Sequence, residues 1–173
     1  MTTTSRTADV TEDSVRSPLA RGTQALTALA HIKPGRREQL QQVLAAVGER
    51  IAAGGPTPLD DIGTVLFARW VFLTDFGEDG GVLFATNYDG SFDDYIRDFA
   101  EQAPDSFEAI YSNCVGWPEG GATDLEAFKA FIRAHELVAD VYYRAYPTAT
   151  VREVKSGLQL RQQFRSMLQQ ASL

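Results

Sequence analysis

His135 is the residue of this sequence with the widest range of possible chemistry. It lies four residues after Phe131 and seven after Phe128, so helical spacing places all three on one apolar stripe and points the imidazole into the protein. A neutral imidazole there could ligate an iron or act as a base near neutral pH. The alternatives are a core histidine bonded to a backbone carbonyl, or a cation favoured by the C-terminal end of its helix.

Arg69 and Asn87 are the polar candidates on predicted strands. Arg69 is the only charge between Thr64 and Thr74, and burying it unpaired is costly, so it must meet a carboxylate, a ligand anion or solvent. A bidentate contact with a substrate carboxylate and a structural ion pair both satisfy this condition. Asn87 could donate a hydrogen bond to a bound substrate, or belong to the turn chemistry of Asn87 to Gly90.

Three phenols and a guanidinium gather between Tyr142 and Tyr146, where the sequence predicts a last strand from Val138 to Tyr146. Adjacent strand residues point to opposite faces, so Tyr142 or Tyr143 could line a pocket for an aromatic ligand while the other packs in the core. Cys114 is expected to be a buried inert thiol, because it follows a helix and nothing in the sequence places a cation or helix N-terminus beside it.

Composition excludes several function classes. The 173 residues carry 16 basic and 23 acidic side chains, a net charge of −7, which disfavours nucleic-acid and anionic-membrane partners. A single cysteine excludes an internal disulfide framework and a structural zinc site of the Cys₄ or Cys₂His₂ type. Nucleotide-binding and Gly-x-Ser-x-Gly motifs are absent. No window is apolar enough for a secretory signal or a membrane span, so we expect a cytoplasmic protein.

The remaining pattern predicts the elements that must position these residues. Residues 1–22 have no sustained periodicity and are expected to form a flexible tail, followed by a single domain over residues 23–173. The predicted order is a strand near Ala25 to Ile32, a helix, a hairpin of two strands, a helical segment, a last strand and a C-terminal helix. Capping pairs three residues apart, Ser91 with Asp94, Thr123 with Glu126 and Thr150 with Glu153, predict the starts of three helices. A β-α-β-β-α-β order is the ferredoxin-like α+β arrangement, here with extra helices.

The predicted second strand is apolar at both even and odd positions, from Val65 to Leu73. In a two-layer fold, helices cover only one face of the sheet. The other face therefore needs a partner, and the sheet of an identical subunit is the simplest one, which predicts a homodimer.

This order of elements, with the Lys33-Pro34-Gly35-Arg36 opening after the first strand, resembles the dimeric α+β barrel superfamily over roughly residues 24–147. The resemblance implies two ferredoxin-like sheets packed into one barrel. The segment from Phe128 to His135 is similar to the helix on which heme-binding members carry their iron ligand, which implies heme held by His135. The asparagine and tryptophan that the heme-degrading members also use have no counterpart here.

The resemblance leads to two functional expectations. The first is a small-molecule oxidoreductase, heme-dependent and peroxidase- or monooxygenase-like. In it His135 ligates the iron, Tyr142 contacts the cofactor, and Arg69, Asn87 and Tyr143 act on the substrate. The second is a homodimer that binds a ligand, or has a stress-related role, without cofactor or catalysis.

Overall fold

A computed structural model describes residues 22–171 of the chain. Its centre is an antiparallel sheet of three strands in the order β1-β3-β2, with β3 in the middle. The strands are β1 (Gln24–His31), β2 (Val65–Leu73) and β3 (Gly81–Tyr88). Because β2 and β3 are joined by a short glycine-rich turn and pair antiparallel, the predicted hairpin is confirmed, as is the mixed α+β class. The predicted N-terminal tail lies outside the described residues, apart from Gly22.

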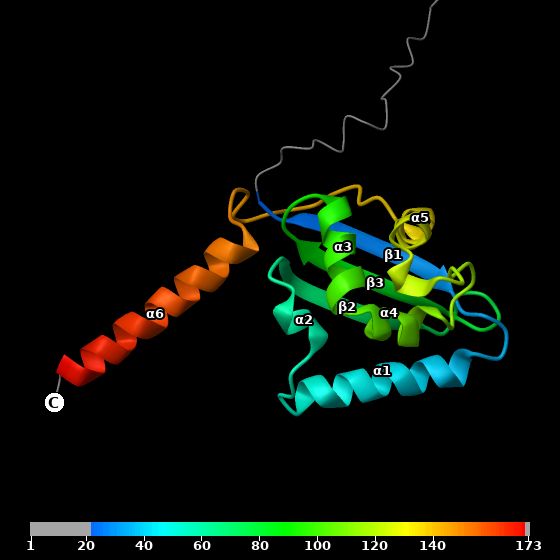
Figure 1. Cartoon of the computed structure of the whole chain (residues 1–173), viewed down its shortest axis with the longest axis horizontal. Coiled ribbons are helices and arrows are strands. Elements are labelled where there is room, and N and C mark those ends of the chain that lie inside the picture. The colour runs from blue at the N-terminus through cyan, green and yellow to red at the C-terminus, as the bar shows by residue number, and fades with distance from the viewer. Residues whose placement is uncertain (1–21, 172–173) are drawn as a thin grey trace, which may run out of the picture.

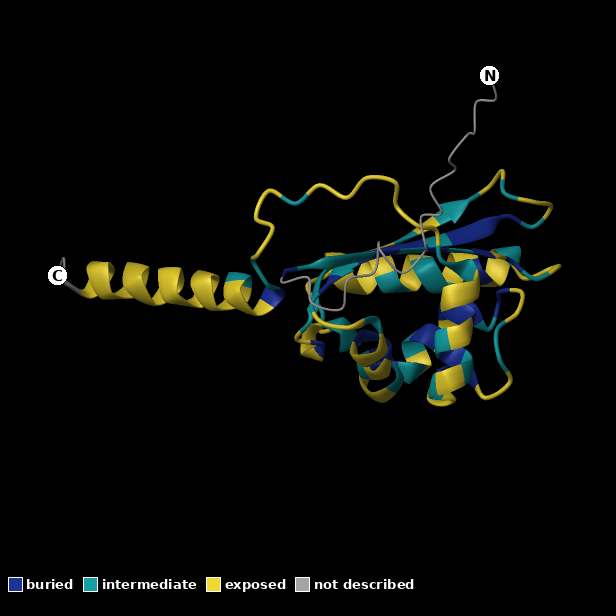
Figure 2. Ribbon diagram, turned by 90° about the horizontal axis from the view of Figure 1, so that it is seen from above, coloured by how far each residue is buried: buried dark blue, intermediate teal, exposed yellow. Residues whose placement is uncertain are grey.

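Helices cover one side of this sheet (Figures 1 and 2). They are α1 (Arg37–Ala52), α2 (Pro58–Asp61), α3 (Phe92–Gln102), α4 (Pro104–Tyr111), the short 3₁₀ helix η2 (Gly121–Thr123) and α5 (Leu125–His135). A further helix, α6 (Val151–Ala171), does not cover the sheet. None of the helices in residues 22–171 is both long enough and apolar enough to cross a membrane.

Side-chain caps fix where the helices of this layer begin. The Ser91 hydroxyl accepts a hydrogen bond from the Asp94 amide at 3.1 Å and so caps α3 as the sequence predicts. The predicted capping box at Thr123 is wrong by one residue. Asp124 caps α5 by accepting from the Ala127 amide at 3.2 Å, while the Thr123 hydroxyl donates to the carbonyl of Gly120.

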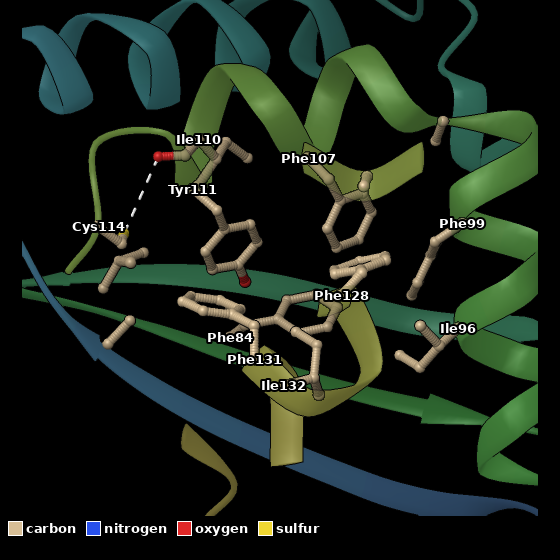
Figure 3. Packing of buried hydrophobic residues seen from close by; sticks show 14 of the residues in the cluster. Phe84, Ile96, Phe99, Phe107, Ile110, Tyr111, Cys114, Phe128, Phe131 and Ile132 are labelled. Carbon is tan, nitrogen blue, oxygen red and sulfur yellow. Dashed lines mark hydrogen bonds between the residues drawn. The ribbon is translucent and has the colours of Figure 1, made fainter. Parts of the chain in front are cut away.

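Aromatic side chains fill the core between sheet and helices (Figure 3). Phe84 of β3 is fully buried; its ring stacks on Trp70 at 4.8 Å and meets Phe99 and Phe107 edge-on at 6.2 and 6.0 Å. Offset and edge-to-face contacts add to the free energy of burial, so Phe84 ties the sheet to two helices at once.

The predicted last strand, Val138 to Tyr146, is not formed in the structure. The chain leaves α5 and bridges β1 once, where Glu136 lies opposite Ala28 and the Leu137 amide donates to the Thr27 carbonyl at 2.8 Å. It next contacts the residues just before β1: Thr23, which bonds to Tyr142 and Arg144, and Gly22, where an added Cβ would lie 2.3 Å from the Pro147 carbonyl oxygen. From Glu136 to Pro147 the chain has eleven residue steps, whereas the facing stretch from Ala28 to Gly22 has only six. This excess length arches the segment away from the strand edge, and a paired strand cannot form.

We call residues 137–149 the arm. In Figure 2 it loops over the side of the sheet opposite the helices, and most of its side chains are exposed. Aromatic and β-branched residues predicted a strand here because they favour strands, but pairing also needs a register that matches the neighbouring strand.

Helix α6 begins at the end of β3 and extends away from the rest of the chain (Figure 1). Thr150 and Glu153 form the predicted capping box: the Glu153 amide donates to the Thr150 hydroxyl at 3.1 Å, and the Thr150 amide donates to the Glu153 carboxylate at 2.8 Å. The Asp89 carboxylate accepts from the amides of Val151 and Arg152. The first turn of α6 is therefore fixed to β3, while every later side chain except Val154 is exposed up to residue 170.

The sheet face opposite the helices is the open face. The strand registers align three rows across it: Ala25, Asn87 and Phe67; Thr27, Ala85 and Arg69; Leu29, Leu83 and Val71. Phe67 is 64% exposed and Val71 is 40% exposed. The sequence-based expectation that helices cover only one apolar face therefore agrees with the structure. Within the described residues of one copy, only the arm lies over part of the open face, and Phe67 and Val71 stay exposed.

Candidate functional site

Polar side chains from four segments lie near one another toward one end of the open face. We call this group the polar corner: Arg69 of β2, Asn87 of β3, Thr23 before β1, and Tyr142 and Arg144 of the arm. Asn87 and Arg69 are diagonal neighbours in the register, since Arg69 lies opposite Ala85. Diagonal neighbours across strands are about 7 to 8 Å apart, within reach of a long side chain.

Tyr142 holds the corner together. Its hydroxyl accepts a hydrogen bond from Asn87 Nδ2 at 3.0 Å and shares another with the Thr23 hydroxyl, also at 3.0 Å. Arg144 Nη1 donates to the Thr23 carbonyl at 3.2 Å, and its guanidinium lies 5.8 Å from the centre of the Tyr142 ring. These contacts fix the middle of the arm over the end of the sheet.

Arg69 brings a positive charge to this apolar face. Its side chain is exposed, and no carboxylate lies within ion-pair distance of it among residues 22–171. Of the two sequence-based alternatives, the structural ion pair is therefore not found in this part of the chain. A guanidinium flanked by Phe67 and Val71 can bind a carboxylate, sulfonate or phosphate while the neighbouring side chains contact an apolar body.

Tyr143 lies beside the corner but does not join it. Its side chain is 83% exposed, against 39% for Tyr142. The prediction that one of these two tyrosines packs in the core while the other lines a pocket is therefore wrong, because both side chains are exposed and the segment does not form a strand.

His135 lies elsewhere, at the end of α5 in the helical layer. Its ring is half-buried, lies 4.3 Å from the Phe131 ring, and has Nδ1 2.8 Å from the Phe131 carbonyl oxygen. A carbonyl only accepts, so Nδ1 carries the proton, and Nε2 is the nitrogen with a free lone pair. The backbone-bonded alternative is thus present, and the same bond sets the tautomer that a metal ligand requires.

Cys114 is a buried thiol, as expected. It is fully inaccessible, and its Sγ lies 4.0 Å from the Ile110 carbonyl oxygen (Figure 3). Burial raises the pKa of the Cys114 thiol to about 12, so it is protonated at neutral pH and is a poor nucleophile or metal ligand.

The helical layer also encloses a small cavity of about 50 Å³, lined by apolar side chains that include Trp70, Phe107 and Ile110. Trp70 Nε1 has no hydrogen-bond partner among the described residues, and neither has the hydroxyl of the neighbouring Tyr111. A volume of this size accommodates water but not an aromatic ligand. The described residues contain no group of three or more His, Cys, Asp or Glu side chains arranged to hold a metal ion.

The structure therefore groups three of the five residues singled out from the sequence, Arg69, Asn87 and Tyr142, and separates them from His135. Thr23 and Arg144 were not singled out as site residues. The pairing of Arg144 with Thr23 depends on an arm that arches over the sheet, which no local pattern reveals. No protein-family model, curated protein or solved structure matches this chain.

Proposed function

We propose that this protein is a homodimer that binds a small aromatic or apolar molecule carrying an anionic group, without a cofactor and without turnover. The ligand lies on the open face, with its anionic group on Arg69 and its apolar body along the neighbouring side chains. The observation that carries this proposal is the exposed guanidinium of Arg69 on an apolar sheet surface, with no ion-pair partner among residues 22–171.

The surrounding charges support selectivity for an anion. The protein as a whole is acidic, with a net charge of −7, yet the polar corner contributes two guanidiniums and no carboxylate. The Tyr142 hydroxyl and Asn87 amide next to Arg69 supply further hydrogen-bonding groups that are already positioned by each other. Preorganised groups cost less entropy when a ligand binds.

A second copy of the chain can supply the cover that the open face of one copy needs. An uncovered sheet face with a side chain as large as Phe67 exposed is typical of an interaction surface. Two copies related by a two-fold axis would shelter both open faces and leave one polar corner per subunit at the edge of the shared region. The dimeric α+β barrel of the sequence-based resemblance is one form that such a dimer can take.

The experiment uses 8-anilinonaphthalene-1-sulfonate, an aromatic anion whose fluorescence reports binding. Replacing Arg69 by Gln should weaken its affinity about tenfold or more, because a charge-assisted hydrogen bond contributes about 1.5 to 3 kcal/mol. Arg36→Gln is the matched control, because the Arg36 side chain is exposed and, within the described part of the chain, bonds to Gln39 alone. The uncharged analogue N-phenyl-1-naphthylamine should bind the wild type and Arg69→Gln equally. Equal sulfonate affinity in the two arginine variants would refute the proposal.

A second candidate function rests on His135. The bond from Nδ1 to the Phe131 carbonyl leaves Nε2 available as an axial ligand, and a heme held there would supply peroxidase- or monooxygenase-like oxidoreductase chemistry. In one copy Arg69 and Asn87 lie on the other side of the sheet, so they would not line this heme site.

Titration with hemin tests this candidate. A Soret band that grows to one hemin per chain, and that is lost in His135→Ala but kept in Cys114→Ala, would support it. Absence of a saturable band in the wild type would remove heme and leave the first proposal unaffected.

A further inference from the structure

Thirteen of the fifteen large apolar side chains that are exposed in the described part of the chain lie on only three surfaces. Two are on the open face, six are on the arm, and five are on α6. A helix that packs only its first turn against the rest of the protein is marginally stable in water, since most helices depend on tertiary packing of an apolar face. Helix α6 therefore requires a partner as much as the open face requires a cover.

The C-terminal half of α6 has one continuous apolar stripe. Leu160, Phe164, Met167 and Leu168 follow the spacing i, i+4, i+7 and i+8, which places them on a single side of the helix. They are 53 to 68% exposed. Leu158, which is 58% exposed, lies on the opposite side of the helix by the same spacing rule.

Helix α6 cannot cover the open face of its own chain in this arrangement. Its first turn is held at the end of β3 by Asp89, and Val151 is fully buried there. From that point the helix runs outward, away from the sheet (Figure 1). The open face that it can reach belongs to a second copy.

The net charges favour contact of α6 with residues 22–150 of a second copy, which we call the body, over contact with the second copy's α6. Helix α6 has four basic residues and one acidic residue, a net charge of +3, whereas residues 22–150 have nine basic and nineteen acidic residues, a net charge of −10. Two α6 helices side by side would bring like charges together, and opposite charges favour helix against body. The turn between β2 and β3 places Asp75, Glu78 and Asp79 at one end of the open face.

We propose that α6 is exchanged between two copies of the chain, so that the stripe of each copy lies on the partner's open face near Val71, Leu83 and Leu29. Arg161, which lies beside Leu168 at the edge of the stripe, then approaches the acidic β2–β3 turn. The stripe from Leu160 to Leu168 is about 12 Å long and matches about four residues of a strand. It covers the end of the open face away from the polar corner.

The expected contact area is that of a stable dimer. Each of the four stripe side chains removes roughly 100 Å² of surface from water, and the sheet beneath loses roughly as much. The exchange forms the contact twice, which gives a total of roughly 1,600 Å², the usual size of a specific protein interface. This inference rests on the homodimer of the proposed function and specifies which surfaces form it.

Static light scattering of the full chain over a range of concentrations tests the exchange. Phe164→Glu should weaken dimerisation at least about 100-fold, because the charge enters both symmetric contacts. Leu158→Glu is the matched control on the other side of α6 and should change the dimer dissociation constant less than about threefold. Circular dichroism should show a folded protein for both variants, since both side chains are exposed in one copy, with at most the helical signal of the unpartnered α6 reduced in Phe164→Glu.

Disulfide cross-linking then identifies the surfaces. A Val71→Cys copy mixed with a ¹⁵N-labelled Met167→Cys copy should form a mixed disulfide dimer, distinguished by mass, and a Leu158→Cys copy should not.

Each other outcome contradicts the exchange in a distinguishable way. A wild type that stays monomeric at every concentration removes the homodimer of the proposed function as well. A dimer that Phe164→Glu leaves intact removes only the exchange and keeps the homodimer. A disulfide between positions 71 and 167 within one copy of a doubly substituted chain shows that α6 folds back onto its own sheet.

Discussion

The attachment of α6 to β3 depends on Asp89, a side chain 62 residues before the helix. Its carboxylate accepts from the amides of Val151 and Arg152, the first two of the helix, whose donors have no partner within the helix itself. Replacing Asp89 by Ala removes these bonds and a negative charge at the positive end of the helix dipole. A lost cap costs about 0.5 to 2 kcal/mol and a lost charge about 0.3 to 1 kcal/mol.

We therefore expect Asp89→Ala to destabilise the first turns of α6 by about 1 to 2 kcal/mol, which corresponds to a factor of about 5 to 30 in the opening equilibrium. Amide hydrogen exchange measured by mass spectrometry should accelerate by this factor in peptides from residues 151–160. Peptides from the core around Phe84 should be unchanged, because α6 has few contacts with the core. Asp89→Asn keeps an acceptor oxygen and should give a smaller effect.

Asp61→Ala is the control, because Asp61 is an exposed carboxylate at the end of α2. Its exchange profile should match the wild type. Unchanged exchange of α6 in Asp89→Ala would refute the role of Asp89. Equal acceleration in α6 and in the core would show that the two unfold together, contrary to the separation seen in the structure.

Three further predictions concern the body. Phe84→Ala should lower the free energy of unfolding by about 3 to 5 kcal/mol in urea titrations, because it leaves a cavity among packed rings; a loss below 1 kcal/mol would contradict that packing. Cys114 should resist thiol reagents until denaturant is added. The pKa of Cys114 is about 12 in the folded protein and near 9 in the unfolded chain, so the thiol contributes its full stabilisation below pH 9. That contribution is lost as the pH rises from 9 toward 12. Cys114→Ala should therefore reduce the fall in the free energy of unfolding over this pH range. The Ser91 hydroxyl, together with Arg97, holds the pKa of Asp94 below its usual range. Ser91→Ala should raise that pKa in an NMR titration and destabilise the protein by about 1 kcal/mol at pH 7, where the wild-type cap is intact; an unchanged Asp94 titration would count against it.

Local patterns predicted the elements whose formation depends on local chemistry. The hairpin followed from two apolar runs around a glycine-rich turn, and the starts of α3 and α6 followed from capping residues. The cap of α5 was misplaced by one residue because Thr123 and Asp124 are both good capping residues, and only the fold decides which one is used. The apolar outer side of β2 correctly indicated a sheet face that helices leave open.

The arm and the polar corner could not be predicted in the same way. The segment from Val138 to Tyr146 has the composition of a strand. The contacts on either side of it, near Leu137 and at Pro147, are too far apart in sequence for its residues to pair in register with β1. The hydrogen bonds of Tyr142 with Asn87 and Thr23 form because the arm arches over the sheet. His135 was placed correctly on the inner side of its helix, yet helical periodicity could not show that the sheet separates it from Arg69.

Sedimentation equilibrium of the full chain at micromolar concentration tests the central claim most directly, namely that a second copy covers the open face. We predict a particle of twice the 19.0 kDa chain mass, in which Val71, 40% exposed in one copy, is protected from labelling by solvent-borne hydroxyl radicals. A particle of 19.0 kDa at every concentration, with Val71 labelled as readily as an exposed side chain, would contradict the claim.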